Sequence, residues 1–273
     1  MEFITNFFTQ ALYRPLFNLL ILIYEYIPGH DFGLAIIILT FSLRSLFYPI
    51  TKKSLKSQKA LNKIQPKVKK IQKKYKDNKE KQMEKIMELY KKREVNPFGG
   101  CLPLLIQLPI LIALYRVFWH GFQPEQLSLL YNFIPNPGQI DPMFLNWLNL
   151  SNPNMIIAGI AAVSQFAQTK MMMGKKQKGD DGNGFAAIFK KQMIFLFPIF
   201  TFVILTKLPA AIGIYWLTSI LFSVGQQYLI SKDKSNKLEK EDKKVKGEEE
   251  SEEKEDKKES NKDKNKKNES RKN

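Results

Sequence analysis

Long apolar stretches alternate with lysine-rich stretches along most of this chain. A transmembrane helix needs about 20 residues to cross roughly 30 Å of hydrocarbon, so apolar runs of about 18–25 residues are candidate spans. The pattern therefore predicts an all-α protein that crosses a membrane several times. The apolar stretches are residues 33–50, 98–118, 155–172 and 193–230, and the lysine-rich stretches are 51–97, 170–191 and 231–273.

The last apolar stretch is long enough to hold two spans. Residues 193–225 are 33 residues, too many for one span, and Lys207 and Pro209 interrupt them within the sequence TKLPA. A turn at this point leaves a first span of about 27 Å, at 1.5 Å per residue. We therefore expect five spans, near residues 32–50, 98–118, 154–172, 191–208 and 209–230.

Lysines and arginines set the orientation of these spans, because cytoplasmic loops of membrane proteins carry an excess of them. Residues 51–97 contain 17 lysines and arginines against five acidic residues, and residues 170–191 contain six against two. Residues 119–154 contain none. We expect 51–97, the loop 173–190 and the C-terminus in the cytoplasm, and 119–154 and the N-terminus outside.

The N-terminal segment, residues 1–31, has a mixed pattern. Its sequence FFTQALYRPLFNLLILIYEYI includes Arg14, Pro15, Asn18 and Glu25, which is typical of a helix that lies in the outer membrane interface. A sixth span is the alternative, since a helix that enters from the cytoplasm and turns at PGHD keeps the same topology. The segment lacks the basic region and cleavage site of a secretory signal, so we expect the mature protein to keep it.

Residues 51–97 predict a helical hairpin with lysine on most of its outer faces. Apolar residues recur at spacings of three and four on both sides of a turn at KDN, as in paired amphipathic helices. The lysines are either a solvated face that enforces topology or a basic surface for anionic lipid, ribosomal RNA or a partner protein. The apolar positions are Leu61, Ile64, Val68, Ile71 and Tyr75 before the turn and Met83, Ile86, Met87 and Tyr90 after it.

The C-terminal tail, residues 231–273, is low in complexity. It contains 16 basic and 14 acidic residues and almost no apolar ones. Such a composition buries too little apolar surface to fold, so we expect the tail to be disordered. It is either a basic arm for ribosomal RNA or a plain solvated tail, and the acidic sequence EEESEEKED argues against the arm.

Four of the predicted spans carry polar side chains that lie inside otherwise apolar sequence. A polar group in lipid is costly, so these side chains should face the bundle interior and form a positively charged hydrophilic cavity. The alternatives are ordinary hydrogen bonds between helices and, for Arg44, a side chain that reaches the cytoplasmic headgroups. The residues are Thr40, Arg44, Tyr48 and Thr51 in the first span, Gln107 in the second, Gln165 and Gln168 in the third, and Trp216, Ser219, Ser223 and Gln226 in the fifth.

Several kinds of site are missing from the sequence. No predicted span contains an acidic residue, which a proton-coupled transporter or an aspartyl protease of the membrane needs. Cys101 is the only cysteine, and His30 and His120 have no ligand spacing, so we expect neither a metal nor a cofactor. No glycine-rich phosphate loop follows a strand. These absences argue against a protease and a nucleotide-driven pump.

Four stretches resemble the YidC/Oxa/Alb family of membrane protein insertases. They occur in the family's order over residues 10–231 and read LNKIQPKVKKIQKKYKDN, LYKKREVNPFGGCLPLLIQLPILIALYR, SQFAQTKMMM and LPAAIGIYWLTSILFSVGQQYLI. The resemblance implies five spans, a cytoplasmic hairpin after the first span, an amphipathic helix before it and no enzymatic activity. It also implies the short form of a bacterial plasma membrane protein, without the large periplasmic domain of Gram-negative members.

The resemblance further implies a groove that is open to the cytoplasm and to lipid. The arginine in its first span corresponds to Arg44, and groove-lining polar positions correspond to Gln107, Gln165, Gln168 and Trp216. The family often has an asparagine after its YW motif, where this chain has Ser219, so a weaker polar group takes that place. Short members often carry a cleaved lipoprotein signal, which this sequence does not show.

We therefore expect a membrane protein insertase and chaperone that guides nascent membrane proteins through a positively charged groove. The implied partners are nascent membrane proteins, the lipid bilayer and the ribosome, which the basic hairpin and tail would contact. The Sec translocon is a further candidate partner. A small channel or transporter with the same polar interior is the alternative, and a scaffold whose lysine-rich hairpin binds a partner is a third interpretation.

Overall fold

The computed structural model describes residues 2–96, 99, 102–120, 123–173 and 185–230. Its described residues are mostly helical, with two short strands, and this confirms the predicted all-α class. The elements are α1 (Glu2–Phe8), the π-helix η1 (Thr9–Tyr13), α2 (Arg14–Tyr26), α3 (Phe32–Leu46), α4 (Tyr48–Lys74), α5 (Lys79–Lys92), α6 (Leu102–His120), the 3-10 helix η3 (Pro124–Leu129), β1 (Met143–Phe144), β2 (Leu148–Asn149), α7 (Met155–Met173) and α8 (Phe185–Leu205).

The chain divides into two compact units, residues 1–225 and 226–273. Helix 210–225 ends the first unit, and residues 226–230 of the second unit are also helical. The predicted tail, most of the predicted loop 173–190, and Cys101 lie outside the described residues. The remaining description concerns the first unit.

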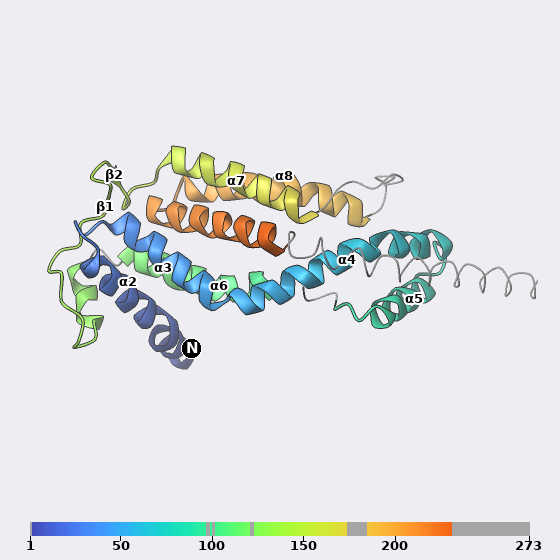
Figure 1. Ribbon diagram of the computed structural model, residues 1–273, viewed down its shortest axis with the longest axis horizontal. Coiled ribbons are helices and arrows are strands. Elements are labelled where there is room, and N and C mark those ends of the chain that lie inside the picture. The colour runs from blue at the N-terminus through green and yellow to red at the C-terminus, as the bar shows by residue number, and fades with distance from the viewer. Residues whose placement is uncertain (1, 97–98, 100–101, 121–122, 174–184, 231–273) are drawn as a thin grey trace, which may run out of the picture. The chain divides into compact units, whose positions relative to one another are not determined.

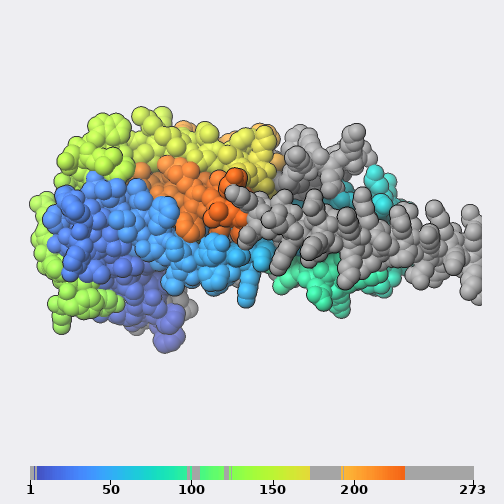
Figure 2. All heavy atoms as spheres, viewed as in Figure 1, coloured from blue at the N-terminus to red at the C-terminus, as the bar shows by residue number. Residues whose placement is uncertain are grey.

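Helix 210–225, which we call the central helix, contacts several other helices of the first unit. Phe222 packs edge-on against Phe41 of α3, with ring centroids 5.6 Å apart, and Gly213 lies against Ile157 of α7. In Figure 1 this helix is drawn in deep orange beside α3 and α7. Figure 2 shows its side chains at the surface between the same two helices. It is therefore well placed to bring residues from different spans together.

The first predicted span is shorter than its apolar pattern. We expected it over residues 32–50, but α3 ends at Leu46, and α4 departs from it at a bend of 66° after the single residue Phe47. Pro49 explains this break, since its ring has no N–H to donate and would clash with the carbonyl four residues earlier in a continuous helix. The last residues of the predicted span therefore belong to the lysine-rich helix.

The two lysine-rich helices, α4 and α5, are joined by residues 75–78 and contact each other. Asn78 caps α5, because its side-chain oxygen accepts a hydrogen bond from the Lys81 amide at 2.9 Å. This cap lies within the predicted KDN turn. Of the predicted apolar positions, Ile64, Val68 and Ile86 are buried, whereas Met83 and Met87 are exposed.

The outward faces of several helices are apolar. On α8, five large apolar side chains are 53–62% exposed, and a contiguous surface of this kind marks contact with protein or lipid. By length and composition, one described helix, Thr5–Tyr26, can cross a bilayer, or two if the bent pair of α3 and α4 counts as one. Leu105–Trp119 and Ile194–Leu205 are shorter apolar helices. The exposed α8 side chains are Phe195, Leu196, Ile199, Phe200 and Val203.

Gly213→Ala should destabilise the protein, and the matched change Gly159→Ala should not. Alanine is favoured over glycine in a helix by about 1 kcal/mol at both positions. At Gly213, however, the new methyl group would lie 2.6 Å from the Ile157 side chain, and overpacking costs about 1–3 kcal/mol. At Gly159 no atom lies within 4 Å of it. In detergent, the apparent Tm should fall for the first variant and stay level or rise for the second. Equal shifts would contradict the close helix contact.

Candidate functional site

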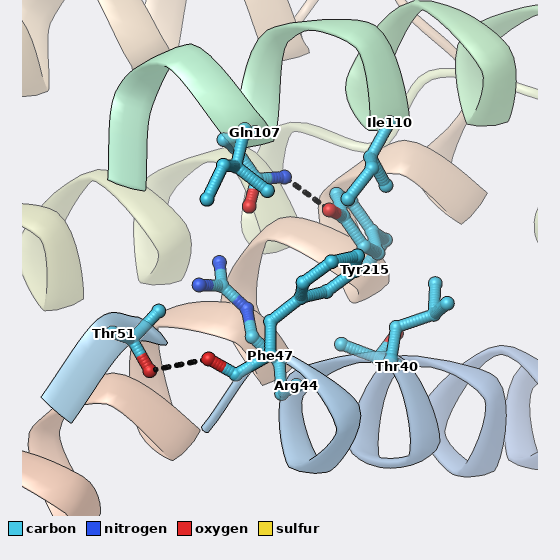
Figure 3. Close-up of a pocket in the computed structure, with 9 residues that line it drawn as sticks. Thr40, Arg44, Phe47, Thr51, Gln107, Ile110 and Tyr215 are labelled. Carbon is cyan, nitrogen blue, oxygen red and sulfur yellow. Dashed lines mark hydrogen bonds between the residues drawn. The ribbon is translucent and has the colours of Figure 1, made fainter. Parts of the chain in front are cut away.

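A cavity lies between α3, the start of α4, α6 and the central helix. It encloses about 350 Å³, counted with the open space at its mouth. Polar and apolar side chains share its wall, as Figure 3 shows, and we call it the Arg44 cavity. Its lining residues are Thr40, Leu43, Arg44, Phe47, Thr51, Ile106, Gln107, Ile110 and Tyr215.

Arg44 supplies the positive charge of this cavity. It lies in the last turn of α3, just before the bend, and its guanidinium group points toward Gln107 (Figure 3). The Thr40 hydroxyl donates to the Ile36 carbonyl of its own helix at 2.6 Å, and the Thr51 hydroxyl donates to the Phe47 carbonyl, directly before α4, at 3.1 Å. Across the part of the chain that the structure describes, no carboxylate forms an ion pair with Arg44.

Gln107 and Tyr215 connect α6 to the central helix across the same cavity. The side-chain amide of Gln107 donates a hydrogen bond to the Tyr215 hydroxyl, as Figure 3 also shows. Tyr215 is 3% exposed. A half-buried glutamine that bonds to a buried phenol favours one rotational setting of both helices, because the phenol hydroxyl would otherwise lose this partner.

Three of the other predicted polar residues, Gln165, Gln168 and Trp216, form a second cluster between α7 and the central helix. The Trp216 indole N–H donates to the Gln165 side-chain oxygen at 3.1 Å, and the Gln165 amide donates to Gln168 and Thr169 at 3.4 Å each. None of these residues lines the Arg44 cavity. Tyr215 and Trp216 are neighbours in a helix and point about 100° apart. The central helix therefore serves two separate polar clusters.

Two residues of the central helix show what the sequence reasoning found and missed. Ser219, a predicted site residue, is buried but is not among the lining residues of the Arg44 cavity. Tyr215, which does line the cavity, was not predicted. It precedes Ser219 by four residues and so shares its helical face, and this spacing was the signal that could have found it.

The polar groups of the Arg44 cavity are of kinds that take part in binding. It offers a cation, an amide and a phenol hydroxyl, and none of the described residues that line it is an acidic residue, a histidine or a cysteine. Within the described ranges, no group of three or more His, Cys, Asp or Glu side chains could hold a metal ion. Such a site can attract an anionic or polar segment of another molecule.

A family model and several named proteins match most of this chain. A model of the family described as 60Kd inner membrane protein matches residues 22–238. The protein named membrane protein insertase YidC from Fusobacterium nucleatum subsp. nucleatum is 37% identical over 202 residues, which are 74% of this chain and 87% of that protein. Proteins of the same name from Geotalea daltonii and Syntrophus aciditrophicus are 33% and 36% identical over 82% and 80% of this chain. Those matches span only 38% and 36% of these longer relatives.

Double-mutant cycles should show that the two polar clusters are energetically separate. The first cycle combines Gln107→Leu with Tyr215→Phe. The coupling free energy of unfolding should be about 0.6 kcal/mol and at most roughly 1.7 kcal/mol, the range for hydrogen bonds between membrane helices. Gln107→Leu and Gln165→Leu lie in different clusters, so their effects on the unfolding free energy should add. Additive effects in the first pair would contradict the bond across the cavity.

Proposed function

The chain belongs to the family described as 60Kd inner membrane protein, and we propose that it is a membrane protein insertase, as its named relatives are. The observation that carries the proposal is Arg44, a cation without an acidic partner among the described residues, in a cavity between helices with apolar outer faces. The described lining of this cavity includes no acidic residue, histidine or cysteine, so we propose that the cavity receives polar segments and that the protein moves other chains without an enzymatic reaction.

We propose that one end of the helix bundle lies on the outer side of the membrane. There, residues 123–152, which we call the outer loop, are bonded to the beginnings of the spans. The Leu145 amide donates to Asp31, directly before α3, and the Ala211 amide of the central helix donates to the Leu150 carbonyl at 3.1 Å. The outer loop contains no lysine or arginine, and the turn before the central helix adds only Lys207. This composition is typical of a segment outside the cytoplasm.

The opposite end is proposed to be cytoplasmic. The Asn62 side chain of α4 donates to the Met172 carbonyl near the end of α7 at 3.0 Å. Ser57 of α4 donates to the Asn96 carbonyl, shortly before α6, also at 3.0 Å. The lysine-rich segment is therefore attached where α7 ends and α6 begins. This grouping of helix ends supports five spans, which are α3, α6, α7, α8 and the helix that begins at residue 210.

We propose that the N-terminal helix lies along the outer interface and is not a sixth span. The Asn18 side chain is 2% exposed, donates to the Leu129 carbonyl at 3.0 Å and accepts from the Tyr131 amide at 2.6 Å. The Tyr24 hydroxyl accepts from the Asp141 amide at 3.1 Å. The helix therefore stays beside the outer loop over these positions, although its length and composition would allow it to cross a bilayer.

In the proposed mechanism, Arg44 attracts the polar segment of a substrate while the substrate's apolar helix enters the lipid. Arg44 lies 12 residues after Phe32, or about 18 Å along the helix, whereas the hydrocarbon core is roughly 30 Å thick. The cavity thus shortens the apolar path that the polar segment must cross. Attraction between charges is stronger there than in water, and burial of the substrate's apolar surface in lipid supplies the free energy. No nucleotide or cofactor takes part.

The lysine-rich hairpin of α4 and α5 is proposed to receive the substrate from the ribosome. Its exposed lysines, such as Lys63, Lys70 and Lys81, lie on the end that we assign to the cytoplasm. A dense row of lysines is attracted to the phosphates of ribosomal RNA in a salt-dependent manner. Binding of the ribosome through the hairpin would place the nascent chain close to the Arg44 cavity.

Arg44→Ala should impair the insertion of a single-span substrate with an acidic outer tail more than that of the same substrate with a neutral tail. Arg44→Lys should keep much of the activity, because the attraction depends on charge. The measurement is insertion into proteoliposomes, read by protection of the tail from protease. Arg116→Ala is the matched control, since Arg116 lies over the Phe8 ring at 5.3 Å and not in the cavity. Equal losses for both tails would contradict the electrostatic role.

A further inference from the structure

The outer loop contains a small β-hairpin whose tip is apolar and exposed. β1 and β2 pair in antiparallel fashion, with Phe144 opposite Leu148. The tip presents Leu145 at 63% exposure and Trp147 at 78% exposure. Residues 142–154 contain no ionisable side chain. A tryptophan and a leucine held open to the surroundings, without a charge nearby in the sequence, suit neither a soluble loop nor a protein core.

The backbone of this tip adopts a conformation that its sequence does not favour. Leu145 and Asn146 have φ angles of +52° and +55°, and the Trp147 amide donates to the Phe144 carbonyl at 3.1 Å. Two successive positive φ angles form a turn that normally contains glycine or asparagine. Leucine in this region costs about 1–2 kcal/mol. Strained residues of this kind point to a role for the exposed side chains.

Three attachments fix the hairpin at the end of the bundle that we propose to be the outer one. Figure 1 shows the hairpin at this end, near the beginnings of α3 and α7. The first is the Leu145 amide, which donates to Asp31, the residue that also caps α3. The second is the Phe144 ring, which packs so closely on Gly33 that a Cβ at this position would clash with it. In the third, the Leu150 carbonyl accepts from the central helix. The tip therefore has a fixed height relative to the first turn of α3.

We infer that Leu145 and Trp147 insert into the outer leaflet of the lipid bilayer and fix the depth of the bundle. The height of the tip coincides with the beginning of a proposed span, which is where hydrocarbon gives way to headgroups. Tryptophan is enriched at this boundary because its ring is apolar while its N–H can bond to water or headgroups. Met155 and Ile156, which begin α7, are exposed apolar side chains as well. The inference uses the proposed orientation but does not depend on the insertase activity.

The test places the full-length chain in phosphatidylcholine vesicles with Trp147 as the sole tryptophan, through Trp119→Phe and Trp216→Phe. Bromines on the upper part of the acyl chains should quench its fluorescence strongly, and bromines near the chain ends should quench it weakly. Acrylamide in the water should quench it little. Strong quenching by acrylamide without quenching by either brominated lipid would overturn the inference.

A second measurement tests the inference if the variant with Trp147 as its sole tryptophan does not fold. In a Cys101→Ser background, a spin label at Leu145→Cys should be more accessible to oxygen than to a water-soluble nickel chelate, and a label at Asn136→Cys in the same loop should show the reverse. Similar nickel accessibility at both positions would overturn the inference. Labelling of Asn136→Cys in whole cells with an impermeant maleimide tests the orientation separately, so a failure of the topology is distinguishable from a failure of the anchor.

Discussion

Hydrogen bonds between polar side chains and distant parts of the chain hold this helix bundle in register, because hydrocarbon offers no partner for such groups. Asn18 bonds through both of its side-chain atoms to the outer loop, Gln107 bonds to Tyr215, and Gln165 accepts from an indole of the central helix. Each bond joins elements far apart in the sequence and so fixes how a helix is rotated about its axis. The bond between Gln107 and Tyr215 fixes two of the side chains that line the cavity with Arg44.

The bend at Phe47 joins the apolar helix α3 to the lysine-rich helix α4 beside the Arg44 cavity. Phe47 itself and Thr51, in the first turn of α4, both line it. A straight helix would carry the lysine-rich segment along the axis of α3. With the bend, α4 instead passes the beginning of α6, where the Ser54 hydroxyl donates to the Gly99 carbonyl. Pro49 thus has a structural role that joins the polar cavity to the lysine-rich helices.

The helices and the individual polar residues could be predicted from the sequence, but most of their partners could not. Arg44 and Gln107 stand out because a charge or an amide is rare in an apolar run. Tyr215 does not stand out, since a tyrosine in an apolar helix is usually a core aromatic. Its hydrogen-bond partner, Gln107, is 108 residues away in the sequence, so only the packing of the helices brings the two together. The same holds for Asn18, whose partners are backbone groups of the outer loop. Every residue has such backbone groups, so the sequence does not indicate which of them bonds to Asn18.

The neutral surroundings of Arg44 are as important to the proposed function as its charge. An arginine near the middle of a membrane helix costs roughly 2.5–3.5 kcal/mol, and a fixed acidic neighbour would offset part of that cost. Such an acidic neighbour would also compete with an acidic substrate segment for Arg44, because binding of the segment would only replace one ion pair by another. Gln107 and Tyr215 give the cavity polarity without a negative charge. In the proposed mechanism the attraction therefore remains available to a substrate. It weakens again once the substrate's polar segment has moved on into water, which screens the attraction between charges.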